Sequence, residues 1–207
     1  MLKGSSRKKV LKYVPKFLKK MILSIFKDKR LFKKYFKQYV VPYTWWEYNH
    51  DPSHRWRLEP ELNLVKDFVK DRNSTVIDAG ANIGTYTCHF EEFSDHVVAF
   101  EPYPPLAQLL LAYAKHNKRV TVYNIGLSDH EGYMDLHTPV DAGDEPATST
   151  FSVIKETHKT ARVPVKTIDS FNFKNVSLMK LDVEGHELKV INGALETIKK
   201  ISPHAHC

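Results

Sequence analysis

Two apolar runs that each end in an acidic residue constrain the fold of this chain more than any other feature. The first reads Val-Ile-Asp-Ala-Gly-Ala-Asn-Ile-Gly over residues 76–84, and the second reads Val-Val-Ala-Phe-Glu-Pro over residues 97–102. A buried strand followed by a glycine-rich turn, and then by a second strand ending in an acid, is typical of α/β domains that bind nucleosides. The glycines allow close approach of a ligand, and the second acid binds ribose hydroxyls. The pair predicts a nucleoside site at the carboxyl edge of a sheet.

The segments around these runs alternate between strand and helix patterns. This alternation predicts an α/β fold, a doubly wound and mostly parallel sheet with helices on both faces. A stretch rich in Thr, Ser, Asp and Pro over residues 138–160 predicts a long loop. Apolar residues after Pro60 predict a helix with a buried stripe at Leu62, Val65, Phe68 and Val69. The expected strands are 75–79, 97–100, 120–124, 162–168 and 177–183, with a short antiparallel strand at 132–137; the expected helices are 83–93, 106–115 and 187–200.

Basic residues are concentrated at the amino-terminal end of the chain. Residues 1–37 carry fourteen Lys/Arg and one acid, whereas the rest carries seventeen Lys/Arg and twenty-three acids, which gives formal charges of +13 and −6. Apolar side chains within residues 1–41 recur every three or four positions, which predicts a basic amphipathic arm. The arm could pack on the domain, lie on an anionic membrane surface or bind nucleic acid. Nucleic acid is the least favoured partner, because the remainder of the chain is acidic.

The remaining organisation follows from composition. Residues 42–58 contain three tryptophans and two tyrosines, and they predict an aromatic linker that covers the domain at residues 59–207. The two cysteines, Cys88 and Cys207, form no disulfide framework, and no apolar run reaches the roughly 18 residues of a membrane span. These features favour a cytoplasmic protein, with peripheral membrane contact through the arm left open. The His-Ala-His-Cys ending has ligand spacing, but chain ends fray, so no metal site is predicted.

The first turn favours a cationic nucleoside ligand. Gly80 and Gly84 are four positions apart, and Asn82 stands where a dinucleotide fingerprint has its middle glycine. A side chain at this position, together with the carboxylate of Asp78, disfavours a pyrophosphate, whereas an anion attracts an ammonium or sulfonium group. With Glu101 on the ribose, S-adenosylmethionine satisfies both conditions. The alternative is that Asp78 only caps the turn and Glu101 only forms a surface ion pair.

Two further runs end at the same carboxyl edge. Asn124–Asp129 follows the third strand, and Ser128 and Asp129 within it are candidate contacts to the adenine. In Leu178–Glu187 a strand ends at Asp182, which could orient an acceptor hydroxyl, act as a base or bind a divalent cation. Glu184 and His186 follow at intervals of two and could share that site. Lys180 is costly to bury unpaired, so Asp182 or an acid on a neighbouring strand is its expected partner.

Five segments together resemble, in order and spacing, the FkbM family of S-adenosylmethionine-dependent methyltransferases. They are VIDAGANIGTYT, VVAFEPYPP, NIGLSDHEG, VKTIDSF and LMKLDVEGHELKVINGA. The resemblance implies a class I methyltransferase, Rossmann-like fold and methyl transfer to an oxygen of a sugar, glycan or small molecule. It implies cofactor contacts by Asp78, Gly80, Asn82, Gly84 and Glu101, and a second signature at Asp182, Glu184 and Gly185. Among catalytic candidates Asp182 is the first expectation, and His186 is the second choice for the base.

The chain also departs from this family. The basic arm lies outside the family pattern, and the family usually continues into further strands after the helix near residue 194, so C-terminal strands could be missing. An inactive methyltransferase-fold scaffold at a membrane surface is therefore the alternative function. A dinucleotide oxidoreductase would require the missing middle glycine. A nucleic-acid methyltransferase would require a stacking and basic motif that the domain lacks.

Overall fold

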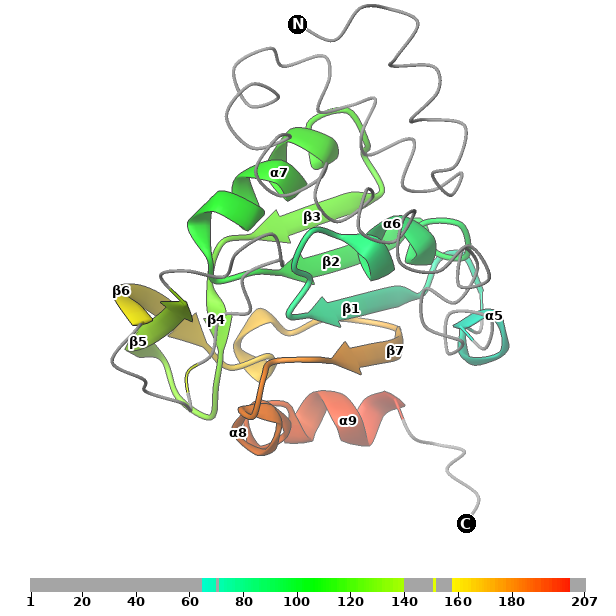
Figure 1. Cartoon of the computed structure of the whole chain (residues 1–207). Helices are drawn as coiled ribbons and strands as arrows, with labels where there is room; N and C mark the ends of the chain where they lie inside the picture. Colours follow the sequence, from blue (N-terminus) through cyan, green and yellow to red (C-terminus); the bar gives the residue numbers. More distant parts are fainter. Residues whose placement is uncertain (1–64, 70, 140–150, 152–157, 202–207) are drawn as a thin grey trace, which may run out of the picture.

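The computed structural model describes residues 65–69, 71–139, 151 and 158–201 (Figure 1). The predicted arm at 1–41, the linker at 42–58 and most of the predicted loop lie outside these residues, as does the Cys207 end. The membrane contact proposed for the arm stays a prediction. In the described part of the chain, no helix is long and apolar enough to cross a bilayer.

Four parallel strands form the main sheet in the order β3–β2–β1–β7 (Figure 1). The pairing sets Ile77 beside Val98 on one side and beside Met179 on the other. Of the strands that the structure describes, the last therefore lies next to the first, which confirms the doubly wound, mostly parallel α/β sheet. Among the described residues, β1 is the one strand neighbour of β7. The bounds are β1 Thr75–Ala79, β2 His96–Phe100, β3 Val120–Tyr123 and β7 Val176–Leu181.

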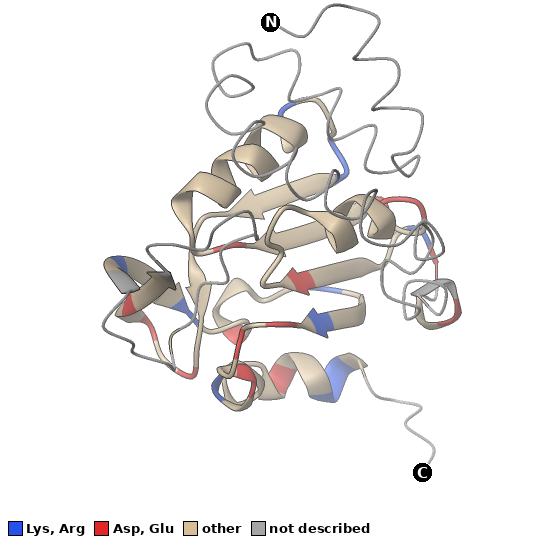
Figure 2. Cartoon of the chain, in the orientation of Figure 1, with Lys and Arg blue, Asp and Glu red and all other residues tan. Residues whose placement is uncertain are grey.

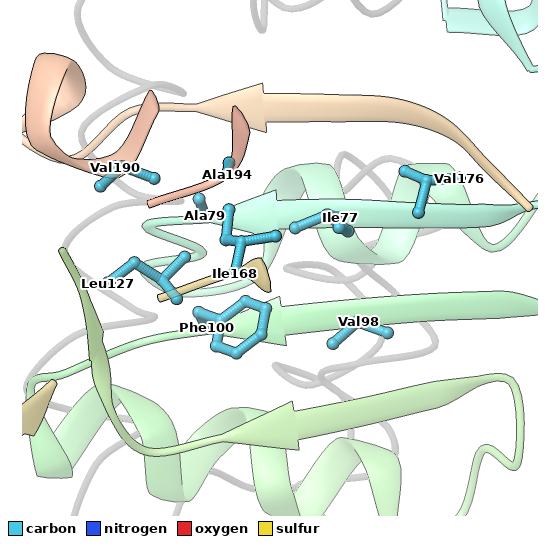
Figure 3. Packing of buried hydrophobic residues seen from close by; sticks show 9 residues of the cluster. All are labelled: Ile77, Ala79, Val98, Phe100, Leu127, Ile168, Val176, Val190 and Ala194. Atoms are coloured by element: carbon cyan, nitrogen blue, oxygen red, sulfur yellow. The ribbon is translucent and has the colours of Figure 1, made fainter. Parts of the chain in front are cut away.

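Helices cover both faces of this sheet, as the sequence predicts. Along β2, Val98 and Phe100 belong to one core cluster, whereas Ala99 between them packs with Leu110 of α7. Alternate strand residues point to opposite faces, so α7 and the α8–α9 pair cover different sides. Figure 3 shows the larger cluster, in which Val190 and Ala194 lie over the strand ends. The helices are α5 Val65–Phe68, α6 Thr85–Phe90, α7 Pro104–Ala114, α8 Glu187–Asn192 and α9 Leu195–Ile201.

A second, smaller sheet stands at the carboxyl end of the main one (Figure 1). Its order is β4–β6–β5, with β5 antiparallel to β6 and β4 parallel to it. The antiparallel strand predicted at 132–137 is confirmed and runs to Pro139. The two-residue strand β4 was not predicted, because two residues carry no alternation. The bounds are β4 Gly126–Leu127, β5 Gly132–Pro139 and β6 His158–Lys166.

The predicted helix at 187–200 is wrong as one element, since it is broken into α8 and α9. At Gly193 a Cβ atom would lie 2.0 Å from the carbonyl oxygen of Ser128, so the chain passes too close there for a side chain. The carbonyl of Gly193 accepts a hydrogen bond from the N–H of Asp169. Asp169 opens the short 3₁₀ helix η3 (Asp169–Phe171), and its carboxylate accepts hydrogen bonds from the N–H groups of Glu196 and Thr197. An Asp from a distant segment thus caps the start of α9.

The substitution Asp169→Ala is expected to lower the free energy of unfolding by about 1–2 kcal/mol, the usual cost of a lost cap. Burial opposes ionisation, but the donors from Glu196 and Thr197 hold the pKa of Asp169 below its usual range. The stability that the ionised cap contributes is therefore present above the unfolded pKa of 3.8 and is lost as pH falls below it. Urea unfolding at pH 7 and pH 3 measures both effects. Equal losses at the two pH values would contradict the capping role.

The single-turn helix α5 corrects a second expectation. Phe68 is exposed by 58%, so it does not belong to a buried stripe as predicted. A helix of four residues presents little more than one turn, and the spacing of three and four cannot build a continuous face there. Cys88, in contrast, is fully buried in α6 as expected.

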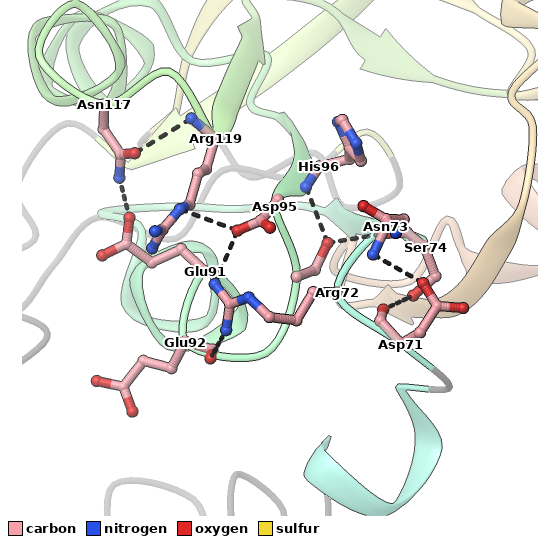
Figure 4. Close-up of polar contacts among 11 residues, drawn as sticks. Asp71, Arg72, Asn73, Ser74, Glu91, Glu92, Asp95, His96, Asn117 and Arg119 are labelled. Carbon is pink, nitrogen blue, oxygen red and sulfur yellow. Dashed lines mark hydrogen bonds and ion pairs between the residues drawn. The ribbon is translucent and has the colours of Figure 1, made fainter.

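The amino ends of the strands are closed by polar contacts (Figure 4). Asp95 lies between the guanidinium groups of Arg72 and Arg119, at 2.7 and 3.0 Å. All three side chains are well exposed, and exposed ion pairs add little to stability. Beneath them, the hydroxyl of Ser94 donates to the carbonyl of Ser74 at 2.6 Å. This end is thus filled by structural contacts, and the opposite, carboxyl end holds the candidate site.

Candidate functional site

A pocket opens at the carboxyl ends of β1, β2 and β7, beside the second sheet. Its empty space, about 580 Å³, includes open solvent at the mouth. One wall carries polar groups and the other is apolar. The polar wall comes from Gly80, Asn82, Glu101, Asp182 and Glu184, and the apolar wall includes Phe100, Leu106, Leu127, Leu136 and Phe151.

The turn after β1 adopts backbone conformations that require its glycines. Gly80 has φ 77° and Gly84 has φ 91°, and Asn82 between them has φ 51°. Gly84 is the residue that precedes α6, where a left-handed conformation favours glycine. The N–H groups of Gly80 and Ala81 both donate to the carbonyl of Phe100 at 3.0 Å. The turn is therefore fixed to the end of β2, where the second acid stands.

Glu101 is held by the backbone on both carboxylate oxygens. Its Oε2 accepts from the N–H of Asn82 and its Oε1 from the N–H of Tyr103, each at 2.8 Å. The amide of Asn124 fixes the same segment by donating to the carbonyls of Glu101 and Pro102. The Glu101 side chain is 5% exposed and borders the pocket. Each carboxylate oxygen keeps a lone pair, so the group can accept further hydrogen bonds from a ligand hydroxyl.

Burial raises the pKa of Glu101 to about 7, against the lowering effect of the Tyr103 and Asn82 N–H groups. The folded chain therefore holds this proton between pH 4.5 and 7, where the unfolded chain has released it. The resulting stability is full below pH 4.5 and is lost as pH rises through 7, a change of roughly 3 kcal/mol. We expect the stability advantage of wild type over Glu101→Gln to be larger at pH 5 than at pH 8. Denaturant unfolding at both pH values checks this, and parallel pH curves would contradict it.

A lysine stands between two of the predicted site acids. The ammonium of Lys180 lies 3.5 Å from Asp78 Oδ1 and 3.2 Å from Asp182 Oδ2, and it donates to the carbonyl of Gly80 at 3.0 Å. It also lies 4.7 Å from the centre of the Tyr86 ring. Figure 2 shows a basic segment at the tip of β7 beside an acidic one at the tip of β1. The expected pairing of Lys180 with Asp182 or a neighbouring acid is confirmed, and both acids take part.

Asp78 is fully buried in this arrangement. Its Oδ2 accepts a 2.6 Å hydrogen bond from the hydroxyl of Thr87, which is also buried. Its Oδ1 has no hydrogen-bond partner among the described residues and faces Lys180 at ion-pair distance. Asp78 is not part of the pocket wall, so its charge acts on the pocket through Lys180 and the turn rather than by contact.

The turn after β7 carries the second group of acids. Glu184 and Gly185 both have positive φ, 53° and 87°. Glu187 braces the turn, because its Oε1 accepts from the N–H groups of Val183 and Gly185. Burial, followed by the charges of Asp182 and Glu187, raises the pKa of Glu184. Asp182 and Glu184 both face the pocket, and Asp182 is well exposed at 57% of its side chain.

His186 lies behind this turn and outside the pocket wall. It is 5% exposed, and its Nε2 is hydrogen-bonded to the hydroxyl of Ser128 at 3.1 Å. Burial, and then the charge of Lys189, lowers the pKa of His186. Ser128 is fully buried, while Asp129 is exposed and pairs with His130 at 2.7 Å. Neither Ser128 nor Asp129 borders the pocket.

The structure thus divides the predicted site residues into two groups. Those that line the pocket are Gly80, Asn82, Glu101, Asp182 and Glu184, whereas Asp78, Gly84, Ser128, Asp129 and His186 lie behind it. Sequence reasoning missed several apolar wall residues, among them Phe100, Leu106 and Leu136. In the sequence, an apolar residue on the inward face of a helix or strand looks the same whether it lines a pocket or packs in the core.

The donor set fits a nucleoside cofactor better than a metal ion. A buried carboxylate with free lone pairs borders the pocket beside the glycine turn, which suits a ribose. In the described ranges, no group of three or more His, Cys, Asp or Glu side chains could hold a metal.

Comparison with known proteins agrees with this geometry. The model of the methyltransferase FkbM domain matches residues 78–206, more than half of the chain. The hexuronic acid methyltransferase AglP of Haloferax volcanii is 25% identical over 160 residues, which cover 71% of this chain and 63% of that protein. Methyltransferase 1 of Beauveria bassiana is 28% identical over 145 residues, or 58% of each chain. The chain spans less than two thirds of the length of these relatives. No solved structure matches.

Proposed function

Because this chain belongs to the FkbM methyltransferase family, we propose that it binds S-adenosylmethionine in the described pocket and methylates a hydroxyl oxygen of a sugar, glycan or small molecule. The observation that carries the proposal is Glu101, a buried carboxylate fixed by two N–H donors beside the glycine turn. When the cofactor is bound, Glu101 would accept hydrogen bonds from the ribose hydroxyls, and Gly80 and Asn82 line the same part of the pocket.

When bound, the cofactor supplies an activated methyl group, and the carbon–sulfur bonding pair remains on sulfur as the acceptor oxygen bonds the methyl carbon. Asp182 orients the acceptor hydroxyl and takes its proton, since its exposed carboxylate borders the pocket at the end of β7. Lys180 holds Asp182 in place by the 3.2 Å ion pair. Glu184 faces the same space, and its raised pKa suits it to a second proton-accepting role.

A glycan acceptor is supported by the name of one relative, a hexuronic acid methyltransferase. The pocket wall of this chain carries Glu101, Asp182 and Glu184, and Lys180 is the basic residue ion-paired beside them. An acceptor that brings its own carboxylate would meet like charges there. A neutral hydroxyl is therefore the first acceptor class to screen, with uronic acids as the comparison.

Calorimetric titration with S-adenosylmethionine tests the cofactor site. We expect Glu101→Ala to weaken binding by about tenfold to a hundredfold, the worth of hydrogen bonds to a charged group. Glu131→Ala, an exposed acid paired with Lys166, is the matched control and should bind as wild type does. Asp182→Asn should keep binding and lose methyl transfer. A folded wild-type chain that does not bind would favour the inactive scaffold instead.

A further inference from the structure

The hydrogen bond between His186 and Ser128 joins two parts of the molecule that are distant in sequence. His186 follows the acidic turn of residues 182–185 and precedes α8. Ser128 follows β4, and its N–H donates to the carbonyl of Lys166 on β6 at 3.0 Å. The two side chains are 58 positions apart and almost fully buried. One side-chain contact thus links the turn after the main sheet to the second sheet.

The turn that this contact holds is strained. Glu184 occupies the left-handed region at φ 53°, which costs a residue with a side chain roughly 1–2 kcal/mol. Such a conformation persists only where neighbouring contacts fix it. At one end the N–H of Asp182 donates to the carbonyl of Ala79, and at the other Glu187 braces two N–H groups. The hydrogen bond to Ser128 fixes His186, which lies between Gly185 and Glu187, to the second sheet.

His186 also supports an apolar part of the pocket wall. The ring of Phe151 lies 5.2 Å from the His186 ring, tilted by 52°. A Cβ atom at Gly126 would come within 2.6 Å of the same phenyl ring, so Phe151 packs closely on β4. Phe151 also lines the pocket. Moving His186 would therefore displace both Phe151 and the acidic turn.

From these contacts we infer that His186 is a positioning residue, and that its hydrogen bond to Ser128 fixes Phe151 and the acidic turn around the pocket. The inference rests on the proposed function, because that function gives the pocket its role. The hydrogen bond between His186 and Ser128 is independent of it. The arrangement differs from that of a general base, which must reach the proton that it removes. His186 faces Ser128 behind the wall, whereas Asp182 faces the pocket.

The positioning role of His186 is tested on the full chain by amide hydrogen exchange and by cofactor titration. Four variants are compared with wild type. His186→Ala and Ser128→Ala remove the contact, His186→Gln keeps a hydrogen-bonding group near the position of Nε2, and His130→Ala is the control. His130 approaches the same hydroxyl at 3.4 Å but is exposed. Each variant is also unfolded with urea, so that local loosening is separated from global loss of stability.

In the two alanine variants at positions 128 and 186, we expect the amides of Val183 and Gly185 to exchange about fivefold faster, as the loss of one hydrogen bond implies. Amides of α7 should keep the wild-type rate. Affinity for S-adenosylmethionine should fall about as much, because the binding-competent pocket is less populated. His186→Gln should restore both values to within about twofold of wild type, and His130→Ala should change neither.

Three results would overturn the inference. One is unchanged exchange in the alanine variants, and another is a glutamine variant that behaves like His186→Ala. The third is a loss of cofactor affinity in the alanine variants that is fully explained by their larger fraction of globally unfolded chain. A base at position 186 would leave cofactor affinity intact in every variant. If wild type fails to bind S-adenosylmethionine while the turn still loosens as expected, the proposed function fails and the positioning contact stands.

Discussion

Replacing Gly80 with alanine is expected to lower the free energy of unfolding by about 4 kcal/mol, through backbone strain and overpacking together. The backbone at Gly80 has φ 77°, and a Cβ atom there would lie 1.9 Å from the carbonyl oxygen of Asp182. That carbonyl belongs to the backbone at the end of β7, so it cannot rotate away. Relief would require β1 and β7 to separate at the pocket. Urea unfolding and cofactor titration measure the two consequences, loss of stability and loss of binding.

Gly132→Ala is the matched control for this change. Gly132 also has a positive φ, 148°, but nothing lies within 4 Å of the position of its added Cβ. Gly132→Ala therefore places a side chain at positive φ, as Gly80→Ala does, but its added Cβ meets no neighbouring atom. If Gly80→Ala and Gly132→Ala destabilise the chain equally, close approach of β1 and β7 is not the reason that position 80 is glycine.

Replacing Lys180 with methionine is expected to lower the free energy of unfolding by about 3–5 kcal/mol, the cost of leaving a buried charge without its partner. Asp78 is fully buried, and Lys180 is its counter-ion at 3.5 Å. Methionine has nearly the same length, so the change removes charge with little change of volume. Equilibrium unfolding at pH 7 measures the loss.

The double variant Asp78→Asn with Lys180→Met identifies the cause. Asparagine keeps an acceptor for the hydroxyl of Thr87, and no buried charge remains. Most of the stability should return, since replacing both members of a buried pair is often neutral. The single variant Asp78→Asn completes the comparison. If the stability losses of Asp78→Asn and Lys180→Met simply add in the double variant, the two residues are not coupled and the ion pair does not stabilise the sheet.

The main sheet could be predicted almost residue by residue, because β1, β2 and β7 are short apolar runs bounded by turn residues. β1 was predicted over its full length, Thr75–Ala79. Gly80 and Glu101 could be assigned to the site for the same reason. Each follows directly from the end of a parallel strand, and parallel strands place their carboxyl ends on one edge.

What the sequence could not predict depends on contacts between distant segments. Asp78 is adjacent to the glycine turn, yet its side chain is directed to Thr87 and Lys180 rather than to the pocket. The break between α8 and α9 arises where Gly193 meets the backbone of Ser128. Neither partner is near in sequence, and a helical pattern that is locally continuous gives no sign of such a contact.

The neighbouring positions of β1 and β7 have a consequence for the order of folding. Gly80 and Lys180, which touch at the pocket, are 100 positions apart. A ribosome completes β1, β2 and β3 well before β7, and pairing across such a separation is slow because a long loop must close. The half-synthesised chain can form the ribose side of the pocket but not the acidic turn. A ligand that contacts both sides would bind only the finished domain, and it would stabilise the last step of folding more than any earlier one.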